Sequence, residues 1–269
     1  MSFRPFASLL VACLLLLSSS RAPAQPPDTV FLEELTWTEL RDQIRSGKTT
    51  ILVPIGGTEQ NGPHMALGKH NVRVKALSAA IARGLGNALV APVLAYVPEG
   101  RISPPEGHMR FPGTITIPDA TFAQILDSAA RSFKAHGFKD IVFLGDHGGY
   151  QTLEKHVADR LNREWAATPV RAHAMLEYYR LTETEYGQLL KSRGYTEQEI
   201  GAHAGLSDTS RLLALDPNLV RTDAMMAPPD SAAGVSGDPR RSTAALGQSG
   251  VDLVVEKTTE AIKAAIARR

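Results

Sequence analysis

The chain has 269 residues, of which 43% are hydrophobic and 21% are charged. This composition provides enough apolar material for one sizeable globular domain, or at most two small ones, and it argues against a disordered chain. The net charge of +1 creates no basic field for nucleic acid or an anionic membrane surface, so the expected partner is a small molecule or a peptide.

The N-terminus has the pattern of a secretory signal peptide. Arg4 is a short positive region, the run 9–17 (LLVACLLLL) is apolar but too short to span a bilayer as a helix, and Ala22-Pro23-Ala24 is a small-x-small cleavage pattern. We expect cleavage after Ala24, which makes 1–24 the signal and places the domain 25–269 in the periplasm or outside the cell, without stable membrane insertion. The alternative is an uncleaved N-terminal anchor.

Apolar runs of strand length alternate with amphipathic segments along the mature chain. The pattern Thr36-x-x-Glu39 is a capping box, which predicts a helix that ends near Ser46-Gly47. Strands are predicted at 51–55, 88–93, 140–144 and 170–175, with helices at 72–85, 119–136, 150–163, 182–193, 196–200, 204–215 and 249–267. This order predicts an α/β fold, a single three-layer domain with a largely parallel central sheet flanked by helices.

Polar residues follow two of the predicted strands. Ligands collect at the carboxyl ends of parallel strands, and two such ends carry the segments 56–71 (GGTEQNGPHMALGKHN) and 145–149 (GDHGG). Glu59, His70 and His147 supply one carboxylate and two imidazoles, the ligand set of many catalytic zinc sites. A loop histidine is more often only a hydrogen-bonding residue, so spacing alone leaves a metal site and a polar loop equally open.

Other loops near these strand ends are expected to shape a substrate pocket. His64 and His108 both lie in turn-forming loops, where function and loop structure are equally open. The segments 98–110 and 225–237 are where we expect the shape of the pocket to be made.

Four ordered blocks resemble the creatininase (creatinine amidohydrolase) family. They are 54–67 (PIGGTEQNGPHMAL), 108–114 (HMRFPGT), 145–149 (GDHGG) and 203–210 (HAGLSDTS), followed by GDP at 237–239. The resemblance implies an α/β domain, usually in homo-oligomers, that hydrolyses a carbon–nitrogen bond with a divalent metal. Its substrates would be small cyclic or linear amides, or peptides in some members. It also implies that Glu59 and His147 are metal ligands and that His203 is the proton shuttle.

The sequence departs from the family pattern within the metal motifs. Asn61 replaces a histidine of the second metal site, His70 replaces the aspartate that bridges two metals, and Gly149 replaces a glutamate of creatininase. An imidazole cannot bridge two cations as a carboxylate can, and an amide oxygen is a poor zinc ligand. We therefore expect one divalent ion per chain, zinc first with manganese or iron as alternatives, and a substrate other than creatinine.

These residues predict a metal-dependent amidohydrolase. Glu59, His70 and His147 would hold the ion, and a metal-activated water would attack the amide carbonyl. Asp146 is either a further ligand or the acceptor of the free N–H of a metal-bound histidine, an orienting role for which Asp208 is the other candidate.

His203 completes the expected catalytic set with Asp208, because it would protonate the leaving nitrogen. Asn61, His64 and His108 are the expected substrate-binding residues. The competing interpretation is a metal-free pseudoenzyme or a small-ligand-binding protein on the same scaffold. A serine hydrolase is disfavoured, because the segment 234–237 (GVSG) lacks the final glycine of a G-x-S-x-G elbow and follows no predicted strand.

Overall fold

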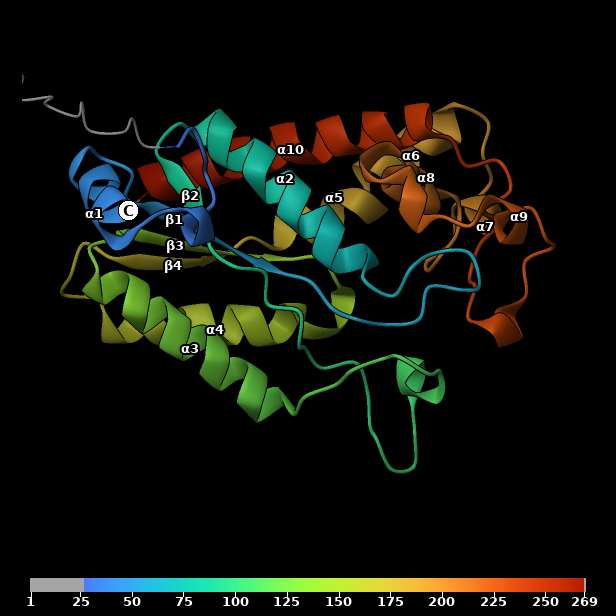
Figure 1. Cartoon of the computed structure of the whole chain (residues 1–269), viewed down its shortest axis with the longest axis horizontal. Coiled ribbons are helices and arrows are strands. Elements are labelled where there is room, and N and C mark those ends of the chain that lie inside the picture. The colour runs from blue at the N-terminus through green and yellow to red at the C-terminus, as the bar shows by residue number, and fades with distance from the viewer. Residues whose placement is uncertain (1–26, 269) are drawn as a thin grey trace, which may run out of the picture.

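A parallel sheet with the strand order β2-β1-β3-β4 lies at the centre of the protein (Figure 1). The computed structural model describes residues 27–268, so the predicted signal peptide lies outside the described residues. The strands are β1 (Thr50–Ile55), β2 (Ala88–Val90), β3 (Asp140–Gly145) and β4 (Arg171–Ala174). Helices cover both faces of the sheet, which confirms the predicted three-layer α/β fold.

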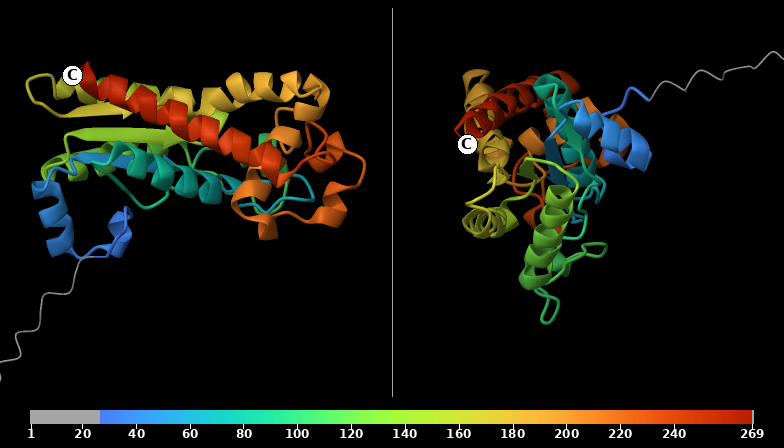
Figure 2. Two further views of the ribbon diagram at one scale, coloured as in Figure 1. Left: turned by 90° about the horizontal axis from the view of Figure 1, so that it is seen from above. Right: turned by 90° about the vertical axis from the view of Figure 1, so that its left-hand side faces the viewer.

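The two faces of the sheet bury separate apolar clusters, because alternate residues of a strand point to opposite sides. Ile51, Val53 and Phe143 pack on the side of α3 (Asp119–Ala135) and α4 (Gln151–Glu164). Leu52 and Val142 pack on the side of α2 (Lys69–Leu85), α5 (Leu176–Glu183) and α10 (Ala244–Ala267). Figures 1 and 2 show these helices in two layers with the sheet between them.

The helices follow the strands in the expected alternating order. They are α1 (Trp37–Arg45), α2 (Lys69–Leu85), α3 (Asp119–Ala135), α4 (Gln151–Glu164), α5 (Leu176–Glu183), α6 (Glu185–Ser192), α7 (Glu197–Ile200), α8 (Leu206–Leu215), α9 (Thr222–Met225) and α10 (Ala244–Ala267). Short 3-10 helices occur at Leu32–Glu34, Gly107–Arg110, Gly148–Tyr150, Pro217–Leu219 and Ser231–Ala233. Within residues 27–268 no helix is both long enough and apolar enough to cross a membrane.

The predicted capping box is confirmed at the start of α1. The Glu39 backbone N–H donates to Thr36 Oγ1 at 3.3 Å, and the Thr36 backbone N–H donates to the Glu39 carboxylate at 2.7 Å. A second cap was not predicted: Thr243 Oγ1 accepts the Leu246 N–H, so α10 begins at Ala244, five residues before the predicted start.

Other predicted boundaries were wrong for local backbone reasons. The segment predicted as one helix at 182–193 forms parts of α5 and α6, because Thr184 between them has non-helical angles (φ −88°, ψ −86°). The helix predicted from 204 begins at Leu206, since Ala204 has a left-handed φ of 55°. The strand predicted to reach 93 ends at Val90, and Pro92 beyond it has no N–H to donate.

Helices α6 to α9 gather beyond the carboxyl ends of the strands (Figure 1). Two small apolar clusters hold this end together, one around Met65, Leu212 and Val235 and the other around Tyr186 and Leu206. The end is joined to the sheet domain because α8 packs against α10. The loops at the carboxyl ends of the strands therefore lie between the sheet and this group of helices.

We predict that the α8–α10 contact depends on a glycine. A Cβ at Gly247 would lie 1.8 Å from the Ser210 carbonyl oxygen, whereas a Cβ at Gly187 in α6 would meet nothing within 4 Å. Gly247→Ala should therefore lower the free energy of unfolding by about 1–3 kcal/mol through overpacking. Gly187→Ala should raise it by about 0.5–1 kcal/mol, because alanine favours the helix. Chemical denaturation of both variants tests this, and equal effects would contradict the packing.

Candidate metal centre

Glu59 is brought to the carboxyl end of the sheet by a tight glycine loop after β1. A Cβ at Gly56 would lie 2.1 Å from Asn71 Oδ1, and a Cβ at Gly57 would lie 2.6 Å from Glu99 Oε1. Asn71 Oδ1 also accepts the Gly57 N–H at 3.0 Å, which ties the loop to the first turns of α2. The two glycines thus allow the loop to pass close to its neighbours and leave Glu59 fully buried.

His147 reaches the same place from the end of β3. β1 and β3 pair in register up to Ile55 and Gly145, so the loops after the two strands begin side by side. Tyr150 Oη donates to the Gly56 carbonyl at 2.6 Å and accepts the His147 N–H at 3.1 Å. This buried tyrosine therefore fixes the two loops relative to each other.

Four side chains form a ligand group, the one set among residues 27–268 with the spacing to hold a metal ion. Glu59, Glu99, His108 and His147 each bring one ligand atom within 4.8 Å of the others. His108 Nε2 lies 3.1 Å and His147 Nε2 lies 3.5 Å from Glu59 Oε2, and His147 Nε2 lies 3.7 Å from Glu99 Oε2. Two carboxylates and two imidazoles suit zinc or manganese.

The protonation chemistry of the ligand group also fits a cation. Glu59 Oε2 and both Glu99 oxygens are buried and have no hydrogen-bond partner among the described residues. Burial and the charge of Glu59 raise the pKa of Glu99 to about 9. Burial lowers the pKa of His147 to about 3 and also lowers that of His108. Neutral imidazoles offer lone pairs, and a bound cation would compensate the two buried carboxylates.

His70, predicted as a ligand, and Asp146, predicted as either a ligand or the acceptor of a histidine N–H, lie outside the ligand group. His70 Nε2 is 2.7 Å from Glu59 Oε1, and His70 Nδ1 is 2.6 Å from Asp146 Oδ2. Asp146 Oδ1 also accepts the Tyr178 hydroxyl at 2.9 Å and Asp146 Oδ2 the Arg73 Nε–H at 2.8 Å. Both ring nitrogens of His70 are thus engaged by carboxylates, and the His70–Asp146 pair holds the Glu59 oxygen that faces away from the ligand group.

His203, the predicted proton shuttle, lies beside the ligand group. Its Nδ1 is 3.7 Å from Glu59 Oε1, and its Nε2 is 2.9 Å from the Gln60 carbonyl oxygen. Burial and the nearby charge of Lys69 lower the pKa of His203 to about 4. The imidazole is therefore neutral at pH 7. Nε2 also lies 3.1 Å from the side-chain amide nitrogen of Gln60, so this ring nitrogen contacts both an acceptor and a donor of Gln60.

Asn61 and His64, two of the predicted substrate-binding residues, do not line the pocket described below. Their side chains make hydrogen bonds that stabilise the loop after β1. The Asn61 side-chain amide donates to the Glu59 and Ala66 carbonyl oxygens at 2.9 and 3.1 Å. His64 Nε2 lies 3.0 Å from Thr209 Oγ1. His108, the third predicted substrate-binding residue, belongs to the ligand group and also lines the pocket.

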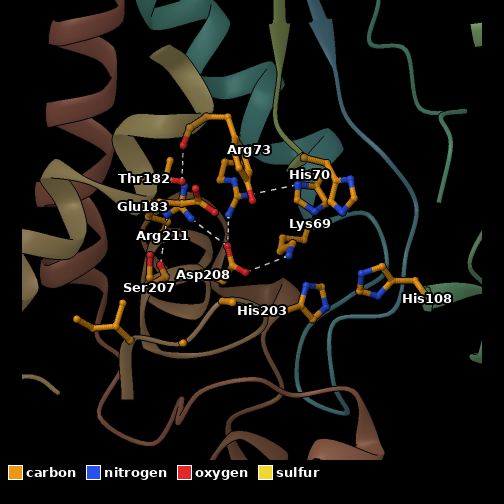
Figure 3. Close-up of a pocket in the computed structure, with 15 residues that line it drawn as sticks. Lys69, His70, Arg73, His108, Thr182, Glu183, His203, Ser207, Asp208 and Arg211 are labelled. Atoms are coloured by element: carbon orange, nitrogen blue, oxygen red, sulfur yellow. Dashed lines mark hydrogen bonds and ion pairs between the residues drawn. The ribbon is translucent and has the colours of Figure 1, made fainter. Parts of the chain in front are cut away.

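A pocket of about 360 Å³ opens onto the ligand group. Figure 3 shows His108 and His203 at one end of it, Arg211, Ser207 and Thr182 at the other, and Asp208 with Lys69 between them. The structure therefore brings His70, His108, His147, His203 and Asp208 to one pocket.

Four charged residues of this site were missed by the sequence analysis. Glu99 lies in the segment 98–110, which was expected to shape the pocket, but nothing in the sequence distinguishes it there from Glu106. Lys69 and Arg73 are four residues apart, which is a recognisable same-face spacing on a helix, but the helix was predicted to begin only at 72. Arg211 lies on α8 one turn after Asp208 and pairs with it.

Comparisons with known proteins identify relatives of this chain. The creatininase family model, described as creatinine amidohydrolase, matches residues 33–262. A creatinine amidohydrolase of Pseudomonas putida is 28% identical over 203 residues, which cover 72% of this chain and 75% of that protein. A mycofactocin precursor peptide peptidase of Mycolicibacterium smegmatis is 30% identical over 229 residues, which cover 77% and 81%. A structure of creatininase with manganese has a TM-score of 0.72 at 25% identity and covers 88% of this chain and 99% of its own. The protein is therefore a member of the creatininase family.

Proposed function

We propose that this protein is a metal-dependent amidohydrolase that cleaves a carbon–nitrogen bond of a small amide. The observation that carries the proposal is the ligand group at the end of a polar pocket, with the neutral imidazole of His203 beside it. Family membership supports a hydrolase. Because the relatives include a creatinine amidohydrolase and a precursor peptide peptidase, the family accommodates amides of different size.

The ion would be held by Glu59, Glu99, His108 and His147, one divalent cation per chain. Glu59 and His147 were expected ligands, whereas Glu99 was not predicted and His108 was expected to bind substrate. Creatininase structures include a manganese form and a Zn-Zn form, so zinc and manganese are the first ions to test. A divalent ion at such a site supplies Lewis acidity to water and to the amide carbonyl.

The protein's own residues would move the proton. The imidazole of His203 is neutral at pH 7 and lies beside Glu59, so its unprotonated nitrogen can accept a proton from the attacking water and deliver it to the departing nitrogen. Gln60 holds the ring, because its carbonyl oxygen and its side-chain amide nitrogen lie 2.9 and 3.1 Å from Nε2. His70 and Asp146 keep Glu59 oriented from the opposite side.

The first prediction concerns the ligands. Glu99→Gln should weaken metal binding by at least about tenfold, since even the loss of a partner that only orients a ligand costs about 10–100-fold. Glu106→Gln is the matched control, because Glu106 lies on the same loop but is exposed and pairs with Arg101. Elemental analysis after dialysis should find about one ion per wild-type chain. Equal metal content in the two variants would contradict the assignment of Glu99.

The second prediction concerns protons. With a pKa of about 9 against an ordinary value of 4.5, Glu99 is protonated at pH 7 in the metal-free protein and must lose its proton to bind an ion. The native state thus holds more protons than the unfolded chain between these values, and the metal-free protein should lose stability as pH rises through this window. Calorimetry in buffers of different ionisation enthalpy should show about one proton more released on metal binding by wild type than by Glu99→Gln. The same proton release in both proteins would be inconsistent with a protonated Glu99.

The third prediction concerns catalysis. His203→Ala should lower kcat by about 10²–10⁴-fold, the usual contribution of a positioned acid or base, with the metal content unchanged. His156→Ala, an exposed change on α4, is the control and should keep wild-type rates. Turnover is measured over a panel of cyclic and linear amides by release of amine. Unchanged kcat in His203→Ala would remove this histidine from the mechanism.

A further inference from the structure

Three basic side chains form one wall of the pocket beyond the ligand group. We call Lys69, Arg73 and Arg211 the basic wall; their exposed fractions are only 1%, 2% and 3%, and all three line the pocket. Burying a cationic side chain is costly, and such residues are seldom this buried unless they are paired. The charges that face them therefore indicate what the pocket can accept.

Two carboxylates pair with the three cations of the basic wall. Asp208 contacts all of them, with Lys69 Nζ at 3.2 Å, Arg73 Nη1 at 2.7 Å and Arg211 Nη2 at 3.0 Å. Asp146 pairs with Arg73 at 2.8 Å. Glu59, 3.5 Å from Lys69, is the next carboxylate, and it belongs to the ligand group.

Asp208 and Asp146 balance two of these three charges, and Lys69 also faces Glu59. With a cation in the ligand group to compensate Glu59, the basic wall would keep one positive charge more than its two carboxylates. Other titratable side chains lining the pocket are the histidines, Tyr179 and Glu183. The histidines belong to the ligand group or contact Glu59. Burial raises the pKa of Tyr179 above its ordinary value, so its phenol carries no charge at pH 7. Glu183 is exposed, so solvent screens its charge.

Arg211 also has a donor that no residue uses. Its Nη2 donates to Asp208 and its Nε donates to the Ser207 carbonyl oxygen, but its buried Nη1 has no hydrogen-bond partner among the described residues. A buried donor without a partner costs about 1–3 kcal/mol. A guanidinium offers its donors in a planar fork that matches a carboxylate. An anionic group of a bound substrate would therefore satisfy Nη1 and balance the charge of the basic wall.

We propose that the basic wall binds a carboxylate of the substrate, so that the amide cleaved at the ligand group belongs to an acidic amide such as an N-acyl amino acid. This rests on the proposed function for the cleavage itself. The ends of the pocket in Figure 3 have separate tasks: the amide is cleaved at the end with His108 and His203, next to the ligand group, and the Arg211 end recognises the acid. Neutral amides lack the group that the basic wall selects.

Binding of two probes, one charged and one uncharged, tests the proposal without turnover. Levulinate carries a ketone that cannot be hydrolysed and a carboxylate, and in acetopropyl alcohol a hydroxymethyl group replaces that carboxylate. Calorimetry on the purified protein with its metal should give a Kd for levulinate at least about tenfold lower, the range of a charged hydrogen-bonded contact. Equal Kd values for the two probes would overturn the proposal.

Three variants locate the carboxylate. Arg211→Met should abolish the preference for levulinate, and Asp208 would still have Lys69 and Arg73 as partners. Arg211→Lys keeps the charge and should retain part of the preference. Glu183→Gln removes an exposed negative charge and should tighten levulinate about twofold without changing the alcohol. This surface variant keeps the test valid if Arg211→Met fails to fold, and no change in its levulinate Kd would count against the proposal.

The outcomes separate this proposal from the proposed function. A levulinate preference that persists in folded Arg211→Met would mean that the carboxylate binds at the metal, which overturns the role of the basic wall while hydrolysis stands. A preference that depends on Arg211 in a protein without amidase activity would support the carboxylate site, and the proposed function would be the part that fails.

Discussion

The buried carboxylate of Glu59 is the group on which the rest of the site depends. Although burial raises its pKa, the charges of His70 and Lys69 hold the pKa of Glu59 below its ordinary value, so it is ionised inside the protein. One oxygen faces His70 and Lys69, and the other faces the imidazoles of His108 and His147. A buried charge of this kind persists only where opposite charges and donors surround it. The other members of the ligand group lie on one side of this carboxylate, and Lys69 of the basic wall lies on the other.

The sheet explains why the ligand group and the basic wall lie next to each other. Parallel pairing of β1 and β3 brings two loops to one edge, and Tyr150 links their backbones. Helix α2 then starts at this edge, so its first two turns carry Lys69, His70 and Arg73 towards the loops. Helix α8 brings Asp208 from the opposite side, held against α10. The chemistry is therefore assembled from segments far apart in the chain.

The periodicity of apolar residues predicted the alternation of strands and helices. The rule that ligands collect at the carboxyl ends of parallel strands predicted that Glu59 and His147 lie close together. They did not predict Glu99, because the long segment between β2 and α3 has no repeating pattern and its glutamates differ only in burial. They also did not predict the basic wall, since Lys69 precedes the first apolar residue that indicated a helix. The resemblance to the family indicated that His70 stands where a bridging aspartate is expected. The partner of each imidazole nitrogen, however, depends on tertiary contacts with Glu59 and Asp146.

The central claim is that Glu59, Glu99, His108 and His147 surround a single divalent ion while His70 remains bonded to Asp146. A crystal structure of the metal-loaded protein, with anomalous data collected on both sides of the metal absorption edge, tests it most directly. The account predicts one anomalous peak within bonding distance of these four side chains and an unchanged His70–Asp146 contact. A peak coordinated by His70 or Asp146, or two peaks per chain, would contradict it.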